Sequence, residues 1–375
     1  MNRHPDVVTL TQKLLAFNTI NPPGAEQACA AYLGSLLQDA GFHVDYAAFA
    51  PARTSLVARI GRAMDKPPLA FTGHMDTVPL GAQRWKHDAF GASLEGGKLY
   101  GRGASDMKSG VAAFVVAALA LAERLRQSPG VTLVLTADEE CGCGGAAFLA
   151  QKTNLLGKVG ALVVGEPTGN YPLVGHKGAL WLEARTSGVT AHGSMPERGD
   201  NAVYKAADAV GILRGFDFGC ATHPLMGPPT LNVGTLHGGI NINSVPDRAT
   251  IGIDIRTVPG QAHDDVRNRL QRALGEAVEI APIVDVEAIC TDPANPWIQR
   301  VFGVTAGHLG ETPGPRTATY FTDAAVLNAV YRDVPVCVLG PGEPQLAHQT
   351  DEYCLVDRVL QSVAIYSELI RDWSL

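Results

Sequence analysis

The segment LAFTGHMDTVP, residues 69–79, begins as an apolar run and ends in polar residues. A short apolar run without alternation predicts a strand buried on both faces, as in a parallel sheet. Val131–Thr136 and Ala161–Val164 have the same form, and helical patterns lie at Glu26–Ala40 and Gly110–Arg126. Strands interleaved with helices predict an α/β domain with a mixed, mostly parallel sheet flanked by helices.

Acidic or imidazole side chains follow each of these predicted strands. Ligand sites in open α/β sheets lie at the carboxyl ends of the strands, so we expect these side chains to share one rim of the sheet. Carboxylates crowded there would repel one another, and a divalent cation would relieve that repulsion. The candidate set, which includes one aspartate between the strands and one late histidine, is His74, Asp76, Asp106, Glu139, Glu140, Glu166 and His348.

The spacing within this set suggests different roles for its members. In an extended segment residues i and i+2 point the same way, so His74 can bind a metal while Asp76 orients its ring. Glu139 and Glu140 are neighbours, so one can bind a metal while the other acts as general base for an attacking water. Two imidazoles together with carboxylates suit zinc better than calcium or magnesium.

The pattern changes after about residue 180, and 375 residues exceed the size of one hydrophobic core. Alternating apolar and polar residues there predict half-exposed antiparallel strands, with two helices between or after them. We therefore predict a catalytic domain of residues 1–178 and 293–375 and an inserted α+β domain of residues 179–292. The segments behind this division are strands Leu180–Thr186, Leu231–Leu236, Ala249–Thr257 and Val334–Leu339, and helices Ala202–Arg214, Ala262–Ala277 and Leu355–Arg371.

Seven segments resemble the co-catalytic dizinc deacylases and carboxypeptidases. This family includes acetylornithine deacetylase, succinyl-diaminopimelate desuccinylase, aminoacylase-1 and glutamate carboxypeptidase. The segments follow in the family's order and span nearly the whole chain, and the resemblance implies that the inserted domain is a ferredoxin-like lid and dimerisation domain. They are FTGHMDTVP (71–79), LYGRGASDMKSG (99–110), TADEECGCGGA (136–146), VVGEPTG (163–169), TAHGSMPERGDNAV (190–203), NSVPDRATIGIDIRTVPG (243–260) and LGPGEPQLAHQTDEY (339–353).

The resemblance also implies a role for each matching residue, with two Zn²⁺ per subunit and Co²⁺ or Mn²⁺ as alternatives. One metal would be bound by His74, Asp106 and Glu166, and the other by Asp106, Glu140 and His348. Asp76 would orient a ligand and Glu139 would be the general acid and base. The peptide bond between Asp106 and Met107 would be cis.

Three further residues match the family in the inserted domain. His192 resembles the histidine that reaches from the partner subunit to polarise the scissile carbonyl, which implies a homodimer. Asn243 and Arg256 resemble the residues that contact the substrate carboxylate, and the guanidinium fork of arginine suits that group.

Finer details favour an acetylornithine deacetylase-like enzyme acting on a small N-acyl amino acid. His176 and Lys177 stand where desuccinylases carry arginines, and a bulky Phe321 replaces a glycine before Thr322-Asp323. Within the family, the alternatives are a dipeptidase or carboxypeptidase acting on peptides and a succinyl-diaminopimelate desuccinylase.

Two readings outside this family are weaker. A nucleotide-binding module at Gly101-Arg102-Gly103 lacks the third glycine and a preceding buried strand. A metal-stabilised binding scaffold without activity would have lost Glu139 or a metal ligand, and all of them are present.

Composition limits the other partners. A net charge of −7 without a basic stripe argues against nucleic acid. The apolar stretch Val111–Ala122 is too short to span a bilayer, so we expect no membrane association. The N-terminal segment lacks an apolar core followed by a cleavage site, and the seven cysteines are scattered, so we expect a cytoplasmic protein.

Overall fold

A computed structural model describes residues 4–332 and 334–375. Residues 1–3, which begin the N-terminal segment predicted to lack a secretory signal, lie outside the described residues. The chain forms two compact units: Met1–Gly175, Cys290–Arg316 and Thr322–Leu375 make the first, and His176–Ile289 and Thr317–Phe321 make the second.

The divisions after residues 175 and 289 lie three residues before the predicted ones after 178 and 292. A larger difference concerns residues 317–321, which sequence analysis placed in the catalytic domain. They belong to the second unit because the backbone amide of Lys177 donates to the carbonyl of Ala318 at 3.1 Å. The ring of Phe321 also lies 5.9 Å from that of Trp181.

The first unit is built on a six-stranded sheet, and the predicted mixed, mostly parallel arrangement is confirmed. Four neighbouring strands, β6, β3, β7 and β14, run parallel, whereas β1 and β2 form an antiparallel edge. In spatial order the strands are β1 (His43–Ala50), β2 (Arg53–Ile60), β6 (Val131–Thr136), β3 (Leu69–His74), β7 (Ala161–Val164) and β14 (Val336–Val338).

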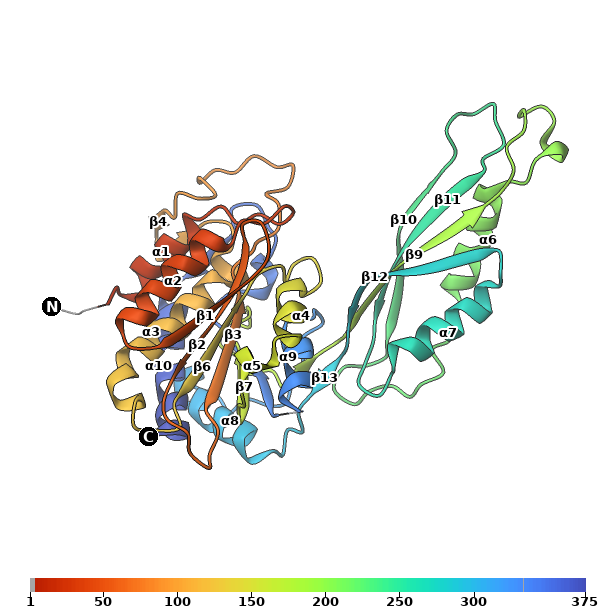
Figure 1. The fold of residues 1–375 in the computed structure, drawn as a ribbon. Coiled ribbons are helices and arrows are strands. Elements are labelled where there is room, and N and C mark those ends of the chain that lie inside the picture. The colour runs from red at the N-terminus through yellow and green to blue at the C-terminus, as the bar shows by residue number, and fades with distance from the viewer. Residues whose placement is uncertain (1–3, 333) are drawn as a thin grey trace. The chain divides into compact units, whose positions relative to one another are not determined.

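Helices cover both faces of this sheet (Figure 1). The central one is α3 (Ser109–Leu125), and its nearly continuous apolar sequence explains why most of its residues are buried. Its Phe114 ring lies 5.8 Å from that of Phe71 in β3 and 6.5 Å from that of Tyr366. By length and composition alone Ala104–Leu125 could cross a membrane, but this packing makes it a core helix.

The other helices of the unit are shorter or more amphipathic than α3. α2 and α10 lie with α3 on one face, and α4 and α9 lie on the other (Figure 1). Their bounds are α1 Val7–Leu15, α2 Gln27–Asp39, α4 Gly144–Ala150, α5 Thr153–Leu156, α8 Pro296–Leu309, α9 Ala324–Tyr331 and α10 Val356–Ser374.

Short strands complete the unit. β5 (Lys98–Tyr100) pairs with β4 (Leu94–Glu95) and with β15 (Tyr353–Leu355), which brings the C-terminal segment beside the loop that follows β5. The remaining short pair is β8 (Gly175–His176) with β13 (Ile289–Cys290), and each of these strands contains the residues at which the chain passes from one unit to the other.

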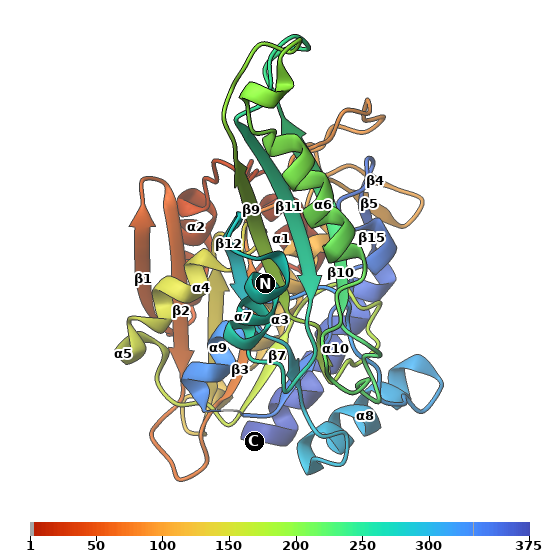
Figure 2. The ribbon, with the colours of Figure 1, turned by 90° about the vertical axis from the view of Figure 1, so that its right-hand side faces the viewer.

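The second unit runs β9–α6–β10–β11–α7–β12, with sheet order β10-β11-β9-β12. This is the predicted ferredoxin-like arrangement. α6 and α7 lie over one face of the sheet (Figure 2), so residues of β9 and β11 alternate between buried and partly exposed. The bounds are β9 Ala179–Ser187, α6 Ala202–Arg214, β10 Thr230–Gly238, β11 Arg248–Arg256, α7 His263–Leu274 and β12 Val278–Val286.

Candidate metal centre and active site

The register of the parallel strands brings the predicted ligands to one edge of the sheet. His74, the last residue of β3, pairs with Thr136, the last residue of β6. Thr72 of β3 pairs with Val164, where β7 ends. The segments that follow β6 and β7 carry the predicted glutamates. The chain therefore leaves β3, β6 and β7 at the same rim of the sheet, as the apolar runs predict.

Three of these residues form what we call the enclosed ligand group: His74, Asp106 and Glu166. Nε2 of His74 lies 3.1 Å from Oδ1 of Asp106 and 3.7 Å from Oε1 of Glu166. The side chains of His74 and Glu166 are only 1% and 5% exposed. Two carboxylates therefore lie close to the same ring nitrogen of His74, and their binding of one shared cation stays a prediction.

A second set forms the open ligand group: Asp106, Glu140 and His348. Nε2 of His348 lies 3.3 Å from Oδ2 of Asp106 and 3.2 Å from Oε2 of Glu140. The His348 side chain is 52% exposed. Asp106 therefore presents one oxygen to each histidine, as a bridging ligand would, and the peptide bond after it is cis, as the resemblance implies.

Electrostatics indicate that this cluster suits cations. Burial raises the pKa of Glu139, Glu140 and Glu166, and the charge of Asp106 raises those of Glu140 and Glu166 further. Hydrogen bonds with Asp106 and Glu140 raise the pKa of His348 to about 10. Among the described residues, the buried Oε1 of Glu140 has no hydrogen-bond partner. Surplus negative charge and a free buried oxygen fit the binding of divalent cations.

Asp76 supports His74 in a different way from the one expected. Nδ1 of His74 is hydrogen-bonded to the backbone carbonyl of Asp76 at 3.0 Å, whereas the Asp76 carboxylate lies 3.6 Å away. That carboxylate instead accepts the backbone amides of Glu139 at 3.1 Å and Glu140 at 3.2 Å. In the neutral ring the proton is therefore held on Nδ1, which leaves Nε2 available as a ligand.

Glu139 lies in the same cluster and is only 5% exposed. One carboxylate oxygen of Glu139 lies within 4.8 Å of a ligand atom of His74 and of one of Glu166. His74, Asp106 and Glu140 form a second group whose ligand atoms all lie within the same distance of one another. The distances thus place Glu139 beside the expected cations, while its role as general base stays a prediction.

Sequence reasoning missed Asp323 as a site residue. It is 2% exposed, accepts a hydrogen bond from Thr136 at the end of β6, and burial raises its pKa to about 6. Its charge also raises the pKa of Glu139 and of Glu166. In the sequence, Asp323 could have been noticed from its position directly before α9 and two residues after Phe321.

Glu352 was also missed, and it holds the loop that carries Asp106. Its carboxylate accepts the backbone amides of Gly103 at 3.0 Å, Ser105 at 2.8 Å and Asp106 at 3.0 Å. It also pairs with Arg102 at 2.6 Å, and burial raises its pKa to about 7. Its place four residues after His348 was the available signal.

The remaining predicted residues, His192, Asn243 and Arg256, all belong to the second unit. His192 pairs with Ser244, and the amide of Gly193 donates to the carbonyl of Asn243 at 2.7 Å, so His192 and Asn243 lie on adjacent segments. Their parts in catalysis stay predictions.

Arg256 has close neighbours within the second unit. Its Nε lies 2.9 Å from Oδ1 of Asp254, and its guanidinium carbon lies 5.8 Å and 6.0 Å from the ring centres of Trp181 and Phe321. The bulky Phe321 is thus part of the surroundings of the arginine that we expect to bind a carboxylate.

Comparisons with known proteins identify the family of this chain. Residues 70–372 match the model of "Peptidase family M20/M25/M40". Two probable succinyl-diaminopimelate desuccinylases of Staphylococcus epidermidis strains are each 29% identical to this chain, over 98% of it and 97% of their own length.

Solved structures show the same fold. A family M20 metallo-carboxypeptidase from Sulfolobus solfataricus has a TM-score of 0.84 at 19% identity, covering 98% of this chain and 99% of that one. A dinuclear metal-binding M20 peptidase from Bacillus subtilis has a TM-score of 0.70 at 14% identity, covering 97% and 96%. With its family model matched over most of its length, the chain belongs to peptidase family M20/M25/M40 and is a metal-dependent amidohydrolase.

Proposed function

We propose that this protein hydrolyses the amide bond of a small N-acyl amino acid, as acetylornithine deacetylase-like enzymes do, with two zinc ions. The observation that carries the proposal is the shared aspartate: Asp106 offers one oxygen to His74 and the other to His348. A carboxylate that offers one oxygen to each of two histidines can hold two cations side by side, and two-metal hydrolases use such a pair of cations.

Each group of residues would have a defined task. The enclosed and open ligand groups would hold the two cations, which when bound polarise the substrate carbonyl and lower the pKa of water. Glu139 would take a proton from the attacking water and deliver it to the leaving amine nitrogen. An imidazole N–H of His192 would stabilise the negative charge that develops on the carbonyl oxygen.

We also propose a cytoplasmic homodimer in which His192 serves the site of the partner. Support comes from the second unit taken by itself. Arg256 ends the nine-residue β11, whereas His192 and Asn243 lie beyond its opposite end, where Arg248 pairs with Ser187. A strand of that length spans roughly 25 Å. One small substrate therefore cannot contact Arg256 together with His192 or Asn243 of the same chain, so in the proposed dimer Asn243, like His192, would serve the site of the partner.

A desuccinylase is the second candidate, favoured by the names of the two Staphylococcus epidermidis relatives. His176 and Lys177, which stand where desuccinylases carry arginines, bond to nearby backbone carbonyls. His176 is buried with Nδ1 bonded to the carbonyl of Lys177 at 2.8 Å, and the Lys177 ammonium donates to the carbonyl of Pro228 at 2.6 Å. A panel of N-acetyl, N-succinyl and N-formyl amino acids and dipeptides would separate these activities.

The test of the mechanism is Glu139→Gln on the zinc-loaded enzyme. We expect turnover of the best panel substrate to fall about 10²–10⁴-fold because the general base is lost, with two metal ions per chain retained. Metal content is measured by atomic emission. Glu123→Gln, on the exposed side of α3, is the matched control and should leave both readouts unchanged.

Two results would contradict the proposed role of Glu139. Near-normal turnover in Glu139→Gln with both metals bound would remove it as the base. Loss of a metal ion from the variant would make it a ligand instead.

A further inference from the structure

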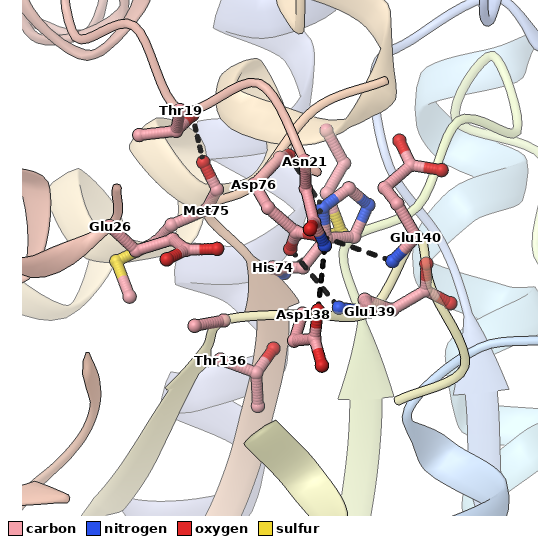
Figure 3. A network of polar contacts seen from close by, with 12 residues as sticks. Thr19, Asn21, Glu26, His74, Met75, Asp76, Thr136, Asp138, Glu139 and Glu140 are labelled. Carbon is pink, nitrogen blue, oxygen red and sulfur yellow. Dashed lines mark hydrogen bonds and ion pairs between the residues drawn. The ribbon is translucent and has the colours of Figure 1, made fainter. Parts of the chain in front are cut away.

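Asn21, which no motif singled out, lies beside the metal centre. It is 3% exposed and sits in the loop between α1 and α2, where its backbone amide donates to the carbonyl of Thr77 at 2.8 Å. Its side-chain nitrogen donates to two carboxylates, Oδ2 of Asp76 at 2.9 Å and Oδ1 of Asp138 at 2.8 Å (Figure 3). Both hydrogens of this amide are therefore used.

The first acceptor, Asp76, joins the ends of two strands. It follows β3, its carbonyl holds the ring of His74, and its carboxylate accepts the backbone amides of Glu139 and Glu140 after β6 (Figure 3). Any rotation of this carboxylate would move the amides that it holds. The bond from Asn21 fixes the same oxygen that accepts the amide of Glu140.

The second acceptor, Asp138, directly precedes Glu139 and has a left-handed backbone conformation with φ of 65°. Its Oδ1 also accepts from the guanidinium of Arg53 at 2.8 Å. Arg53 in turn donates to both oxygens of the buried Glu26 and to the carbonyl of Pro23, each at 2.8 Å. The turn that carries Glu139 is thus held by Asn21 on one side and by Arg53 on the other.

The chemistry of an amide suits this position. Asp76 and Asp138 approach the same point, and a carboxylate there would repel both. An aliphatic side chain of the same size would leave buried oxygens without a donor. A primary amide supplies two N–H donors on one nitrogen and adds no charge.

We propose that Asn21 is a positioning residue of the metal centre, an amide clamp between Asp76 and Asp138. It acts on His74 through Asp76 and on the backbone of Glu139 and Glu140 through both carboxylates. This inference rests on the proposed metal centre, and it assigns Asn21 no contact with metal or substrate.

The test replaces the amide and measures binding of Co²⁺ alone by calorimetry and by the visible spectrum of the Co²⁺ form. Asn21→Leu keeps the size of the side chain and removes both donors, so we expect Co²⁺ binding to weaken about 10–100-fold, with an altered spectrum. Asn21→Asp should weaken it more, because it adds a carboxylate against two others. The matched control is Asn18→Leu, an exposed position in the same loop, which should behave like the wild type.

Further readouts separate positioning from folding and from the proposed function. Thermal unfolding of the metal-free variants reports on the fold. If Asn21→Leu does not fold, Asn21→Ser, which keeps one donor, takes its place with a smaller expected loss of affinity. With a substrate from the panel, the loss should appear in kcat and leave KM nearly unchanged.

Unchanged Co²⁺ affinity and spectrum in a folded variant that lacks the amide would overturn the clamp while leaving the metal centre intact. Failure of the wild type to bind Co²⁺ would overturn the metal centre itself, and the clamp with it.

Discussion

The two ligand groups share Asp106 but differ in how the fold holds them. In the enclosed group His74 ends a central strand and its side chain is 1% exposed. In the open group His348 lies in a loop with a positive φ of 64°, and its side chain is 52% exposed. Side chains on strands are held more rigidly than side chains on loops. We therefore expect the enclosed group to bind a cation more tightly than the open group.

The largest effect expected from this difference concerns the two histidines. His74→Ala should lose the tightly bound cation, because the two carboxylates of the enclosed group lose their imidazole partner. Without that cation, turnover should fall at least about 10³-fold. His348→Ala should keep one tightly bound cation and lose only the weaker one. Metal content after dialysis and Co²⁺ titration would measure both effects.

An exposed histidine, His43, provides the control for these two variants, and His43→Ala should retain both cations. Equal losses of affinity in His74→Ala and His348→Ala would show that burial does not distinguish the two groups. A tighter remaining cation in His74→Ala than in His348→Ala would reverse the comparison.

A smaller effect is expected from burial alone, which changes the pKa of a histidine differently at His74 and at His176. Burial would lower the pKa of His74, but the hydrogen bond with Asp106 and the charges of Glu166, Glu139 and Asp76 raise it well above its usual value. His176 is equally buried, and burial lowers its pKa to about 4, because no acidic group among the described residues raises it. Its Nε2 has no hydrogen-bond partner among the described residues.

The consequence is a pH-dependent stability. A histidine in the unfolded chain has a pKa of about 6.5. Between pH 6.5 and 4 this histidine is therefore protonated in the unfolded chain, whereas His176 in the folded chain stays neutral. The free energy of unfolding should therefore fall as pH drops through this window, by about 2–3 kcal/mol from this residue. Above pH 6.5 its contribution should be constant.

Urea unfolding of the metal-free protein at pH 7.5 and pH 5 would measure this loss. His176→Leu, which cannot take up a proton, should lose less stability on acidification than the wild type does. The same loss in both proteins would show that His176 does not contribute to the pH dependence.

Much of the metal centre could be predicted from sequence because local patterns place it. Apolar runs ending in His74, in Glu139 and Glu140, and in Glu166 define strand ends, and parallel strands bring those ends together. Glu352 and Asp323 could not be predicted in the same way, because their partners lie about 250 and 190 residues away in the chain. Only the folded chain brings such groups together.

Two strand regions show the same limit. The hairpin of β1 and β2 turns at Pro51 and Ala52, without the glycine or asparagine that predicts a tight turn, although Ala52 takes a left-handed φ of 60°. β12 contains Pro282 and has irregular alternation, which a strand tolerates at the edge of a sheet, where β12 lies. Tertiary pairing, and no local signal, makes these segments strands.

The central claim is that His74, Asp106 and His348 act together on a pair of cations. Anomalous diffraction from crystals of the zinc-loaded protein tests it most directly. We expect two peaks with ligand distances of about 2.0–2.2 Å, one bound by His74, Asp106 and Glu166 and the other by Asp106, Glu140 and His348. Zinc peaks only at other residues, or none at all, would contradict the account.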